Sequence, residues 1–318
     1  MKFSRPRIVV LGSANTDLVV RVPHLPASGE TIAGGDFHTL PGGKGANQAV
    51  AAARQGAEVY FIGAIGSDDF GSRLRDGLAR DGIDLKHLAT LPGVASGVAM
   101  IVLDALGQNT IVLSPGANAR VTPAQVEAAE SVIRDADALL CQLETPLPAV
   151  LRAIEIAQVH GVIVMLNPAP AQPLEASLLA RVAYLLPNET EAALLTGLRV
   201  TDVASAGQAA ARLRTLGARR VLVTLGGQGV LIAEDEASSL AAALTVPVVD
   251  TTGAGDTFVG CFAVAIAEGR TTAQAVCEAQ CAAALKVTRL GAQNTIPRRD
   301  EVRAFMRQQG KPAADRSS

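Results

Sequence analysis

The sequence predicts an α/β protein with a central, mostly parallel sheet flanked by helices and a small β-sheet lid. From Val121 onward, helix-like runs alternate with short apolar strand-like runs, and this rhythm favours parallel strands joined by crossover helices. Residues 96–113 break the pattern, because two β-rich runs there flank a turn. The chain has 318 residues, 49% of them hydrophobic, which is enough for a large core.

The composition argues against several classes of protein. The net charge is −2, and aromatic residues make up 3% with no Trp, so neither nucleic acid nor an anionic membrane is an expected partner. The four cysteines show no C-x-x-C spacing and the four histidines are scattered, which favours core thiols over a metal cluster. The apolar run Ile8–Leu11 is too short for a signal peptide, and no uninterrupted run could span a bilayer. We therefore expect a cytoplasmic protein.

The first strand is expected at Arg7–Gly12, a short apolar run that ends in glycine. Asn15 and Asp17 follow it, separated by one residue. On extended backbone, alternate side chains point to one face, so this pair could face a ligand. A turn is the alternative, because Asn and Asp also favour turns.

A glycine-rich segment, Pro41–Ala49, leads into an alanine-rich helix that we expect to end at Gly56. Its spacing matches neither the P-loop nor the G-x-G-x-x-G of a dinucleotide fold. Lys44 and Asn47 lie three residues apart at the helix start and can face one ligand. The preceding glycines would let a polyhydroxy molecule reach the backbone. A solvated lysine after a turn is the alternative.

The next segments separate the main sheet from the lid. Val59–Ile65 is expected to be a strand and Phe70–Asp81 an amphipathic helix. The hairpin that follows, together with the β-rich residues 32–40, suggests a small sheet of its own. We expect this lid to be built from about 15–42 and 94–114.

The second half of the chain alternates strand and helix. Strands are expected at 138–143, 162–166, 182–186 and 220–224, and helices from Thr122, at 146–160 and at 206–216. Ligands of parallel sheets bind at the carboxyl ends of the strands. We expect the polar residues at such ends to converge, namely Glu144, Asn167, Asn188, Thr224 and Asp256.

The stretch Val249–Phe258 carries the most specific signal. The apolar run 244–249 predicts a strand, and two glycines then lead into a helix. Glycines and a helix N-terminus present N–H groups that bind anions, yet Asp256 is itself an anion. A carboxylate there suits a base that takes a proton from a hydroxyl while N–H groups hold the developing charge. The alternative is an N-cap aspartate beside glycines that allow tight packing.

These motifs resemble a known family. Gly42–Asn47 and Asp250–Asp256 look like the two signatures of the ribokinase-like, PfkB-type carbohydrate kinases. The resemblance runs in order and spacing from about Val9 to about Phe305, through the further segments Gly12–Asp17, Leu143–Glu144, Asn167–Ala171, Pro187–Glu191, Thr224–Gly226 and Val287–Gln293. It implies one kinase domain over residues 1–308. Residues 309–318 include Gln, Gly, Lys and Ser, and we expect them to form a frayed tail.

The resemblance implies an activity, which is phosphoryl transfer from ATP to the 5-hydroxyl of D-ribose to give D-ribose 5-phosphate and ADP. It also implies Mg²⁺ with the ATP, K⁺ as a monovalent activator, and a homodimer formed through the lid. One alternative is a related kinase for another sugar or nucleoside, such as deoxyribose or adenosine. Another is a non-catalytic regulator on the same fold, against which the intact Asp256 argues. A dehydrogenase is disfavoured because no G-x-G-x-x-G follows the first strand.

The resemblance also implies roles for individual residues. Asp256 would be the catalytic base, below an anion hole made by Gly253, Ala254 and Gly255. The sugar would be bound by Asn15, Asp17, Gly43, Lys44, Asn47, Glu144 and Asp256, whose chemistry suits a densely hydroxylated molecule. The nucleotide would be bound by Asn188, Thr224, Leu225, Gly226, Gly227, Gln228, Gly229, Gly255 and Gln280.

Two cation sites follow from the same resemblance. Glu191 would help to organise Mg²⁺ indirectly. A monovalent cation would be held, mostly by backbone carbonyls, by Asp250, Thr252, Lys286, Arg289, Gly291 and Thr295. Gln280 lies where some members carry a His beside the adenine, which leaves the adenine packing open. Lys286 lies where a small residue can occur, and this change is harmless if only its carbonyl serves.

Overall fold

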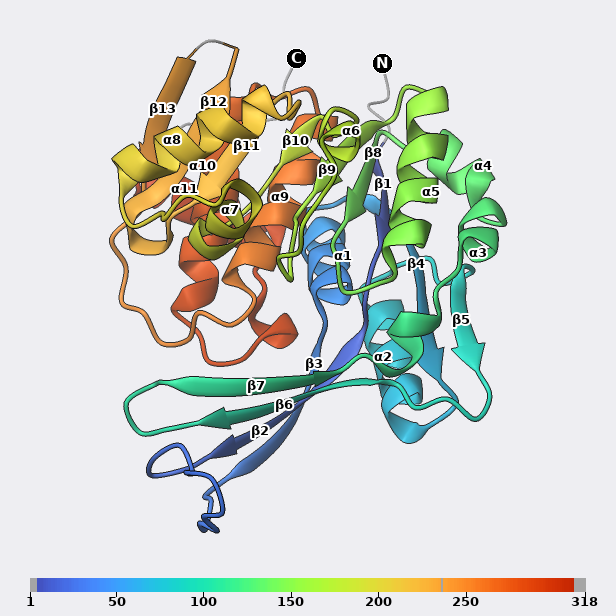
Figure 1. Ribbon diagram of the computed structural model, residues 1–318, viewed down its shortest axis with the longest axis vertical. Helices are drawn as coiled ribbons and strands as arrows, with labels where there is room; N and C mark the ends of the chain where they lie inside the picture. Colours follow the sequence, from blue (N-terminus) through green and yellow to red (C-terminus); the bar gives the residue numbers. More distant parts are fainter. Residues whose placement is uncertain (1–4, 236, 312–318) are drawn as a thin grey trace.

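The main sheet of the computed structural model matches the predicted fold class (Figure 1). Within residues 5–235 and 237–311, which the structure describes, this sheet has nine strands in the order β13-β12-β11-β10-β9-β8-β1-β4-β5. Neighbours from β5 to β11 are parallel, and β12 and β13 add an antiparallel edge. The strands are β1 Arg7–Leu11, β4 Glu58–Gly66, β5 Leu88–Leu91, β8 Ala138–Cys141, β9 Ile163–Leu166, β10 Tyr184–Leu185, β11 Val221–Thr224, β12 Gly229–Glu234 and β13 Ala237–Ala242.

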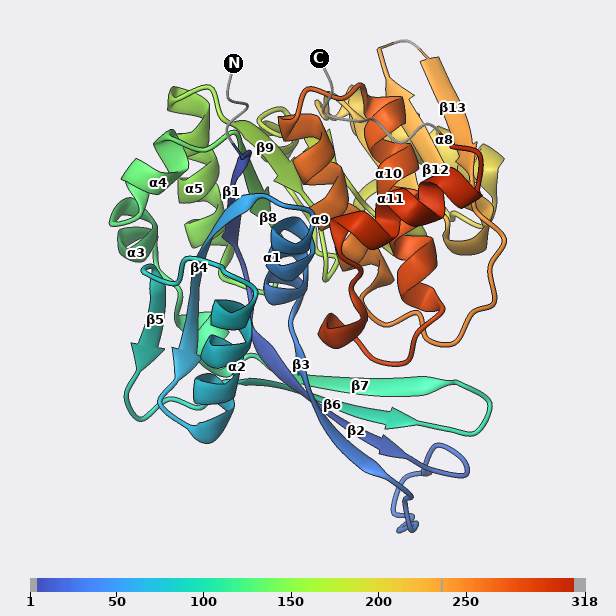
Figure 2. The same ribbon diagram turned by 180° about the vertical axis from the view of Figure 1, so that it is seen from behind.

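Helices cover both faces of this sheet. One face carries α1 Lys44–Arg54, α2 Asp69–Arg80, α9 Ala254–Ala267, α10 Thr272–Val287 and α11 Arg299–Gln308 (Figure 2). The other carries α3 Pro123–Glu127, α4 Glu130–Arg134, α5 Leu147–Val159, α6 Ala176–Leu179, α7 Glu189–Thr196 and α8 Val203–Thr215 (Figure 1). None of the described helices combines the length and the apolar character that crossing a bilayer requires.

The two helical layers create two hydrophobic cores. Along β1, Ile8 and Val10 enter one core and Val9 and Leu11 enter the other. All four side chains are fully buried. Successive side chains of a strand point to opposite faces, so a strand covered on both sides is apolar throughout. This is why the strands appear in the sequence as continuous apolar runs.

A second, smaller sheet projects from the body below the carboxyl ends of the main strands (Figure 1). In the described part of the chain it has four strands in the order β3-β2-β6-β7. These are β2 Asn15–Arg21, β3 Phe37–Gly42, β6 Gly97–Leu103 and β7 Asn109–Ser114. Asn15 and Asp17 lie on β2, so their side chains share a face and the turn alternative is wrong.

The predicted strand at 244–249 is wrong. The edge strand β13 ends at Ala242, and the chain from 243 to 250 forms no strand. Pro247 lacks the N–H that a strand ladder requires. Val249 and Asp250 instead donate their N–H groups to the carbonyl of Val287, at 2.8 and 3.2 Å. Asp256 therefore lies in α9 after a loop, and not at the end of a strand.

Two further differences concern short or terminal segments. The edge strand β5 was not predicted, because four residues at the rim of the sheet leave little periodicity to recognise. The short helices α4, α6 and α7 were likewise not predicted. Part of the expected frayed tail, residues 312–318, lies outside the described residues.

Candidate active site

Asp256 lies in the first turn of α9, whose N-cap is Gly253 in the left-handed conformation, with φ of 75°. The side chain is 8% exposed. Nδ2 of Asn47 donates to Oδ2 of Asp256 at 2.8 Å, and Nε2 of Gln48 donates to Oδ1 at 3.1 Å. Two donors hold the carboxylate in one orientation and leave lone pairs for a substrate hydroxyl. Because Gly253 is the N-cap, the alternative that Asp256 is an N-cap residue is wrong.

The anion-hole candidates occupy the start of the same helix. Gly253 tolerates its positive φ because it has no Cβ. Ala254 donates its N–H to the carbonyl of Thr251 at 3.1 Å. A Cβ on Gly255 would meet nothing within 4 Å, so this end of α9 is open to a ligand. First-turn N–H groups lack partners within their own helix and attract anions.

The α1 entrance is packed closely against the end of β1. A Cβ on Gly45 would lie 2.6 Å from Cα of Gly12, so neither glycine can be replaced without movement of the backbone. Gly43, the N-cap of α1, has φ of 90°. This close approach brings Lys44 and Asn47 from α1 to the same edge as the polar residues that follow β1.

Gln48 is a site residue that the sequence did not reveal. It is fully buried, and its Nε2 also lies 3.2 Å from Oδ1 of Asn167. Nε2 of Gln142 donates to Oε1 of Gln48 at 2.6 Å. Nδ2 of Asn167 in turn lies 3.4 Å from Oε2 of Glu191. A chain of side-chain hydrogen bonds thus joins Asp256 to Glu191 through Gln48 and Asn167.

Glu144 is the centre of the polar cluster at the base of the small sheet. Its Oε2 accepts a short hydrogen bond from Oγ of Ser13 and one from the backbone N–H of Lys44 at 3.2 Å. Nδ2 of Asn15 lies 3.4 Å from the same oxygen. Asn118, which the sequence did not single out, donates to Oδ1 of Asn15 at 2.7 Å and orients that side chain.

The site concentrates acidic groups around one lysine. Burial lowers the pKa of Lys44, but Asp256, Glu144, Glu191 and Asp17 outweigh burial and raise it, so this ammonium stays charged. Burial, reinforced by Glu144 and Asp256, raises the pKa of Asp17 to about 7 although Lys44 opposes the shift. The carboxylates and the lysine form the convergent hydrogen-bonding set that a polyhydroxy ligand needs.

The predicted nucleotide residues follow β10 and β11. Asn188 caps α7, accepting from the N–H of Glu191 at 2.8 Å, while Oε2 of Glu191 accepts from the N–H of Asn188 at 2.9 Å. Asn188 pairs with Thr224 in an isolated parallel bridge. The loop continues through the 3₁₀ turn Gly226–Gln228, where a Cβ on either glycine would meet nothing within 4 Å. The loop therefore presents open backbone to solvent.

Gln280 and Glu191 are the two remaining residues of the predicted nucleotide and Mg²⁺ sites. Nε2 of Gln280 donates to the carbonyls of Ala241 and Ala242, at 2.8 and 3.4 Å, so its amide holds the end of β13. Burial raises the pKa of Glu191, against the backbone hydrogen bond from Asn188 and the charge of Lys44.

The residues of the predicted monovalent-cation site lie together, with one difference. The Asp250 carboxylate accepts the N–H groups of Thr252 and Gly291, each at 2.9 Å. Oγ1 of Thr295 donates to the carbonyl of Gly291 at 2.7 Å, and the side chain of Arg289 turns away to Glu301 at 2.6 Å. The side chain of Lys286 also takes part, because its Nζ donates to the carbonyl of Asp250 at 2.8 Å.

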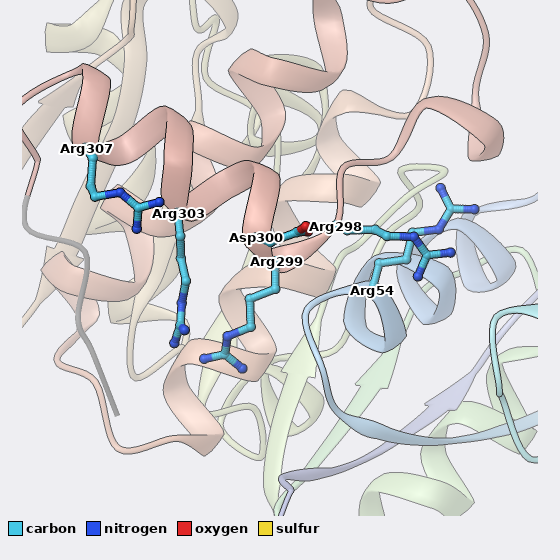
Figure 3. A pocket seen from close by; sticks show the side chains of 6 residues that line it. All are labelled: Arg54, Arg298, Arg299, Asp300, Arg303 and Arg307. Carbon is cyan, nitrogen blue, oxygen red and sulfur yellow. The ribbon is translucent and has the colours of Figure 1, made fainter. Parts of the chain in front are cut away.

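A separate cavity of about 470 Å³ lies beside α11 and contains none of the predicted site residues (Figure 3). Its lining is Arg54, Arg298, Arg299, Asp300, Arg303 and Arg307. Several of these guanidinium groups already have carboxylate partners, because Arg54 pairs with Asp81 at 2.8 Å and Arg299 with Glu268 at 2.5 Å. The cluster therefore joins α11 to the body of the protein.

Comparison with known proteins gives a consistent family. The model of the pfkB family carbohydrate kinases matches residues 5–299. Ribokinase of Haemophilus influenzae is 44% identical over 302 residues, which cover 95% of this chain and 99% of that protein. Ribokinase of Schizosaccharomyces pombe is 43% identical over 300 residues, covering 91% of this chain and 94% of that protein.

A solved structure agrees with this match. Arabidopsis thaliana ribokinase complexed with ribose and ATP superposes with a TM-score of 0.89 at 35% identity, covering 95% of this chain and 99% of that chain. The residues matched by the family model, 5–299, include both sheets and both glycine-rich helix entrances. The chain belongs to the pfkB family of carbohydrate kinases.

Proposed function

We propose that this chain is an ATP-dependent ribokinase, which phosphorylates the 5-hydroxyl of D-ribose and releases D-ribose 5-phosphate and ADP. The observation that carries the proposal is the buried Asp256 carboxylate, held by Asn47 and Gln48 at the open N-terminus of α9. The high identity to ribokinases over nearly the whole chain supports ribose as the sugar. ATP as the phosphoryl donor is consistent with a cytoplasmic enzyme.

The sugar would lie between the small sheet and the body. Asn15 and Asp17 on β2 would contact it from the sheet, and Lys44, Asn47 and Glu144 from the body, beside the backbone of Gly43. These groups offer both donors and acceptors, so each ribose hydroxyl can be paired. A site built from fixed polar groups discriminates strongly against a molecule that lacks one hydroxyl, because a buried partner is then left unpaired.

In the reaction, Asp256 would accept the proton of the 5-hydroxyl as the oxygen attacks the γ-phosphorus of ATP. The hydrogen bonds from Asn47 and Gln48 would keep the carboxylate aimed at that oxygen. The N–H groups of Gly253 and Gly255, at the positive end of the α9 dipole, would stabilise the charge on the transferred group. The N–H of Ala254, which donates to the carbonyl of Thr251, would join them by turning to the ligand. Catalysis of this kind depends on positioning and charge stabilisation.

The nucleotide would lie along Asn188 and the loop Thr224–Gly229. The chemistry of Glu191 suits Mg²⁺, which prefers oxygen ligands and keeps several waters. Both Glu191 oxygens already accept hydrogen bonds from Asn188, so Glu191 would hold the ion through water. When bound, Mg²⁺ would neutralise phosphate charge. The family resemblance further implies a monovalent positive charge beside the anion hole. Either a free ion or the ammonium of Lys286 could supply this charge.

The small sheet would act as a lid and as a dimer interface. Leu18, Met100 and Val112 are neighbours across three strands, on the face opposite to Asp17. Phe37, Met100 and Val112 are 60%, 48% and 54% exposed. Apolar side chains gathered on one exposed face mark an interaction surface, and a second lid would cover them and the sheet edge. The proposed assembly is therefore a homodimer through the lids.

The test is ADP formation from Mg-ATP with a panel of sugars and nucleosides. D-Ribose should be the preferred substrate over 2-deoxy-D-ribose, hexoses and adenosine. Preferred turnover of 2-deoxy-D-ribose or adenosine would keep the family and the base but replace the proposed substrate. Absence of turnover with every member of the panel would contradict the proposed kinase activity and favour a sugar- or nucleotide-binding protein.

A further inference from the structure

Lys286, in the last turn of α10, is a fully buried lysine inside the predicted monovalent-cation site. Its Nζ donates to the backbone carbonyl of Asp250 at 2.8 Å. Burial of an ammonium is unfavourable unless its charge and its N–H groups find partners. Burial lowers the pKa of Lys286, and the Asp250 carboxylate opposes that shift. The lysine thus has both an oxygen ligand and a counter-charge in Asp250.

Several other oxygens of this site already accept hydrogen bonds. The carbonyl of Gly291 accepts from Oγ1 of Thr295 at 2.7 Å, and the carbonyl of Lys286 accepts from the N–H of Arg289 at 3.1 Å. The Asp250 carboxylate accepts two backbone N–H groups. A free monovalent ion needs several oxygens turned toward it, and the carbonyl of Asp250 already has an ammonium. The Lys286 ammonium therefore competes with a free ion for the oxygens of this site.

The lysine also lies where a positive charge would act on the reaction. Asp250 begins the turn that leads to Gly253, and the N–H groups of Val249 and Asp250 are held by the carbonyl of Val287. The C-terminal end of α10 therefore anchors this turn through both its backbone and its Lys286 side chain. A lysine ammonium is a compact monovalent cation with three donors. Placed here, it would order the anion hole and favour negative charge near it.

We propose that the Lys286 ammonium is a covalently attached replacement for the monovalent cation, so that this enzyme works without added K⁺. The kinetic part of this inference rests on the proposed kinase function. The structural part concerns only which cation occupies the site, and it can be tested on the folded protein without any substrate.

The kinetic test compares KCl with tetramethylammonium chloride at equal ionic strength. The wild-type rate should differ by less than about twofold between the two salts, whereas Lys286→Ala should lose about 100-fold in tetramethylammonium and recover in K⁺, because an ion can then occupy the vacated space. Lys286→Met fills that space without a charge and should stay slow in both salts. Lys86→Ala, at an exposed lysine, should behave as wild type.

The substrate-free test is the melting temperature, Tm, in the same two salts. The Tm of Lys286→Ala should rise with KCl but not with tetramethylammonium chloride, since an ion that binds only the folded state stabilises it. The wild-type Tm should be equal in both. A wild-type rate or Tm that rises specifically with K⁺ would overturn the inference. A folded Lys286→Ala variant whose Tm is the same in KCl and in tetramethylammonium chloride would also overturn it. If Lys286→Ala does not fold, the two wild-type comparisons decide.

The two proposals fail in different ways. Wild-type protein that turns over no sugar would contradict the kinase function, and the Tm comparison would still decide how the site is occupied. Wild-type protein that phosphorylates ribose only with K⁺ would keep the kinase function and overturn the role of Lys286.

Discussion

Nδ2 of Asn47 donates to Oδ2 of Asp256 at 2.8 Å, although 209 positions separate the two residues in the sequence. Asn47 belongs to the first glycine-rich helix entrance and Asp256 to the second. The contact exists because α1 and α9 pack side by side on one face of the main sheet (Figure 2). Asn47, a proposed sugar-binding residue, is therefore hydrogen-bonded directly to Asp256, the proposed base.

Replacement of Asp256 by Asn should lower kcat by about 10²–10⁴, because an amide cannot accept the hydroxyl proton. Ribose binding should persist, since Asn47, Lys44 and Glu144 are untouched. Steady-state kinetics and ribose titration by calorimetry would measure both effects. Asp202→Asn, at the N-cap of α8, is the matched control and should leave kcat unchanged. Near-normal turnover in Asp256→Asn would remove Asp256 as the base.

Replacement of Glu144 by Ala should raise the KM for ribose by about 10- to 100-fold, the effect of losing a charged hydrogen-bonding partner. The carboxylate also holds Ser13 and the N–H of Lys44, so the variant disorders the sugar pocket more than the nucleotide loop. The KM for ATP should therefore change less. Glu175→Ala removes an exposed carboxylate and should alter neither constant. An unchanged KM for ribose would place the sugar elsewhere.

Asp17 should make stability depend on pH. Burial, then repulsion by Glu144 and Asp256, raises its pKa from 3.8 to about 7 in the folded state. The folded protein keeps a proton that the unfolded chain loses, so this contribution to stability is present below about pH 4 and is lost as the pH rises through about 7. The free energy involved is at most about 4 kcal/mol.

The variant Asp17→Asn should accordingly gain in Tm relative to wild type at about pH 8 more than at about pH 5. Thermal unfolding at the two pH values measures this difference without substrate. Asp36→Asn, at an exposed aspartate beside β3, should keep the wild-type pH dependence. The same slope of Tm with pH in wild type and Asp17→Asn would show that the proton is held elsewhere.

The exposed face of the small sheet should control assembly. Val112→Lys places a charge beside Met100 on the exposed face, and an unpaired charge in an apolar interface is unfavourable. The variant should shift the protein from dimer to monomer in light scattering after size exclusion. Val159→Lys changes a valine that is 80% exposed at the end of α5, and it should leave the mass unchanged. A monomeric wild-type protein would refute the proposed dimer.

Much of the site could be predicted from the sequence, because several of its residues have a spacing that is typical of one face of a strand or helix. Asn15 and Asp17 alternate along the chain, and Lys44 and Asn47 lie about one helical turn apart, so spacing predicted a common face for each pair and left a turn or a solvated lysine as the alternative. Gln48 and Asn118 could not be found in this way. Their importance comes from contacts with Asp256, Asn167 and Asn15 that are distant in sequence.

The layered α/β class and both glycine-rich helix entrances could be predicted from the sequence, because hydrophobic periodicity and turn chemistry are local properties. The motifs at those entrances also indicated the family. Two other features became visible in the fold: residues 244–249 form a loop held by Val287, and the Lys286 side chain reaches the carbonyl of Asp250. Both depend on how α10 packs beside α9. The direction of a buried side chain is set by the cavity around it, which distant segments build and no local pattern encodes.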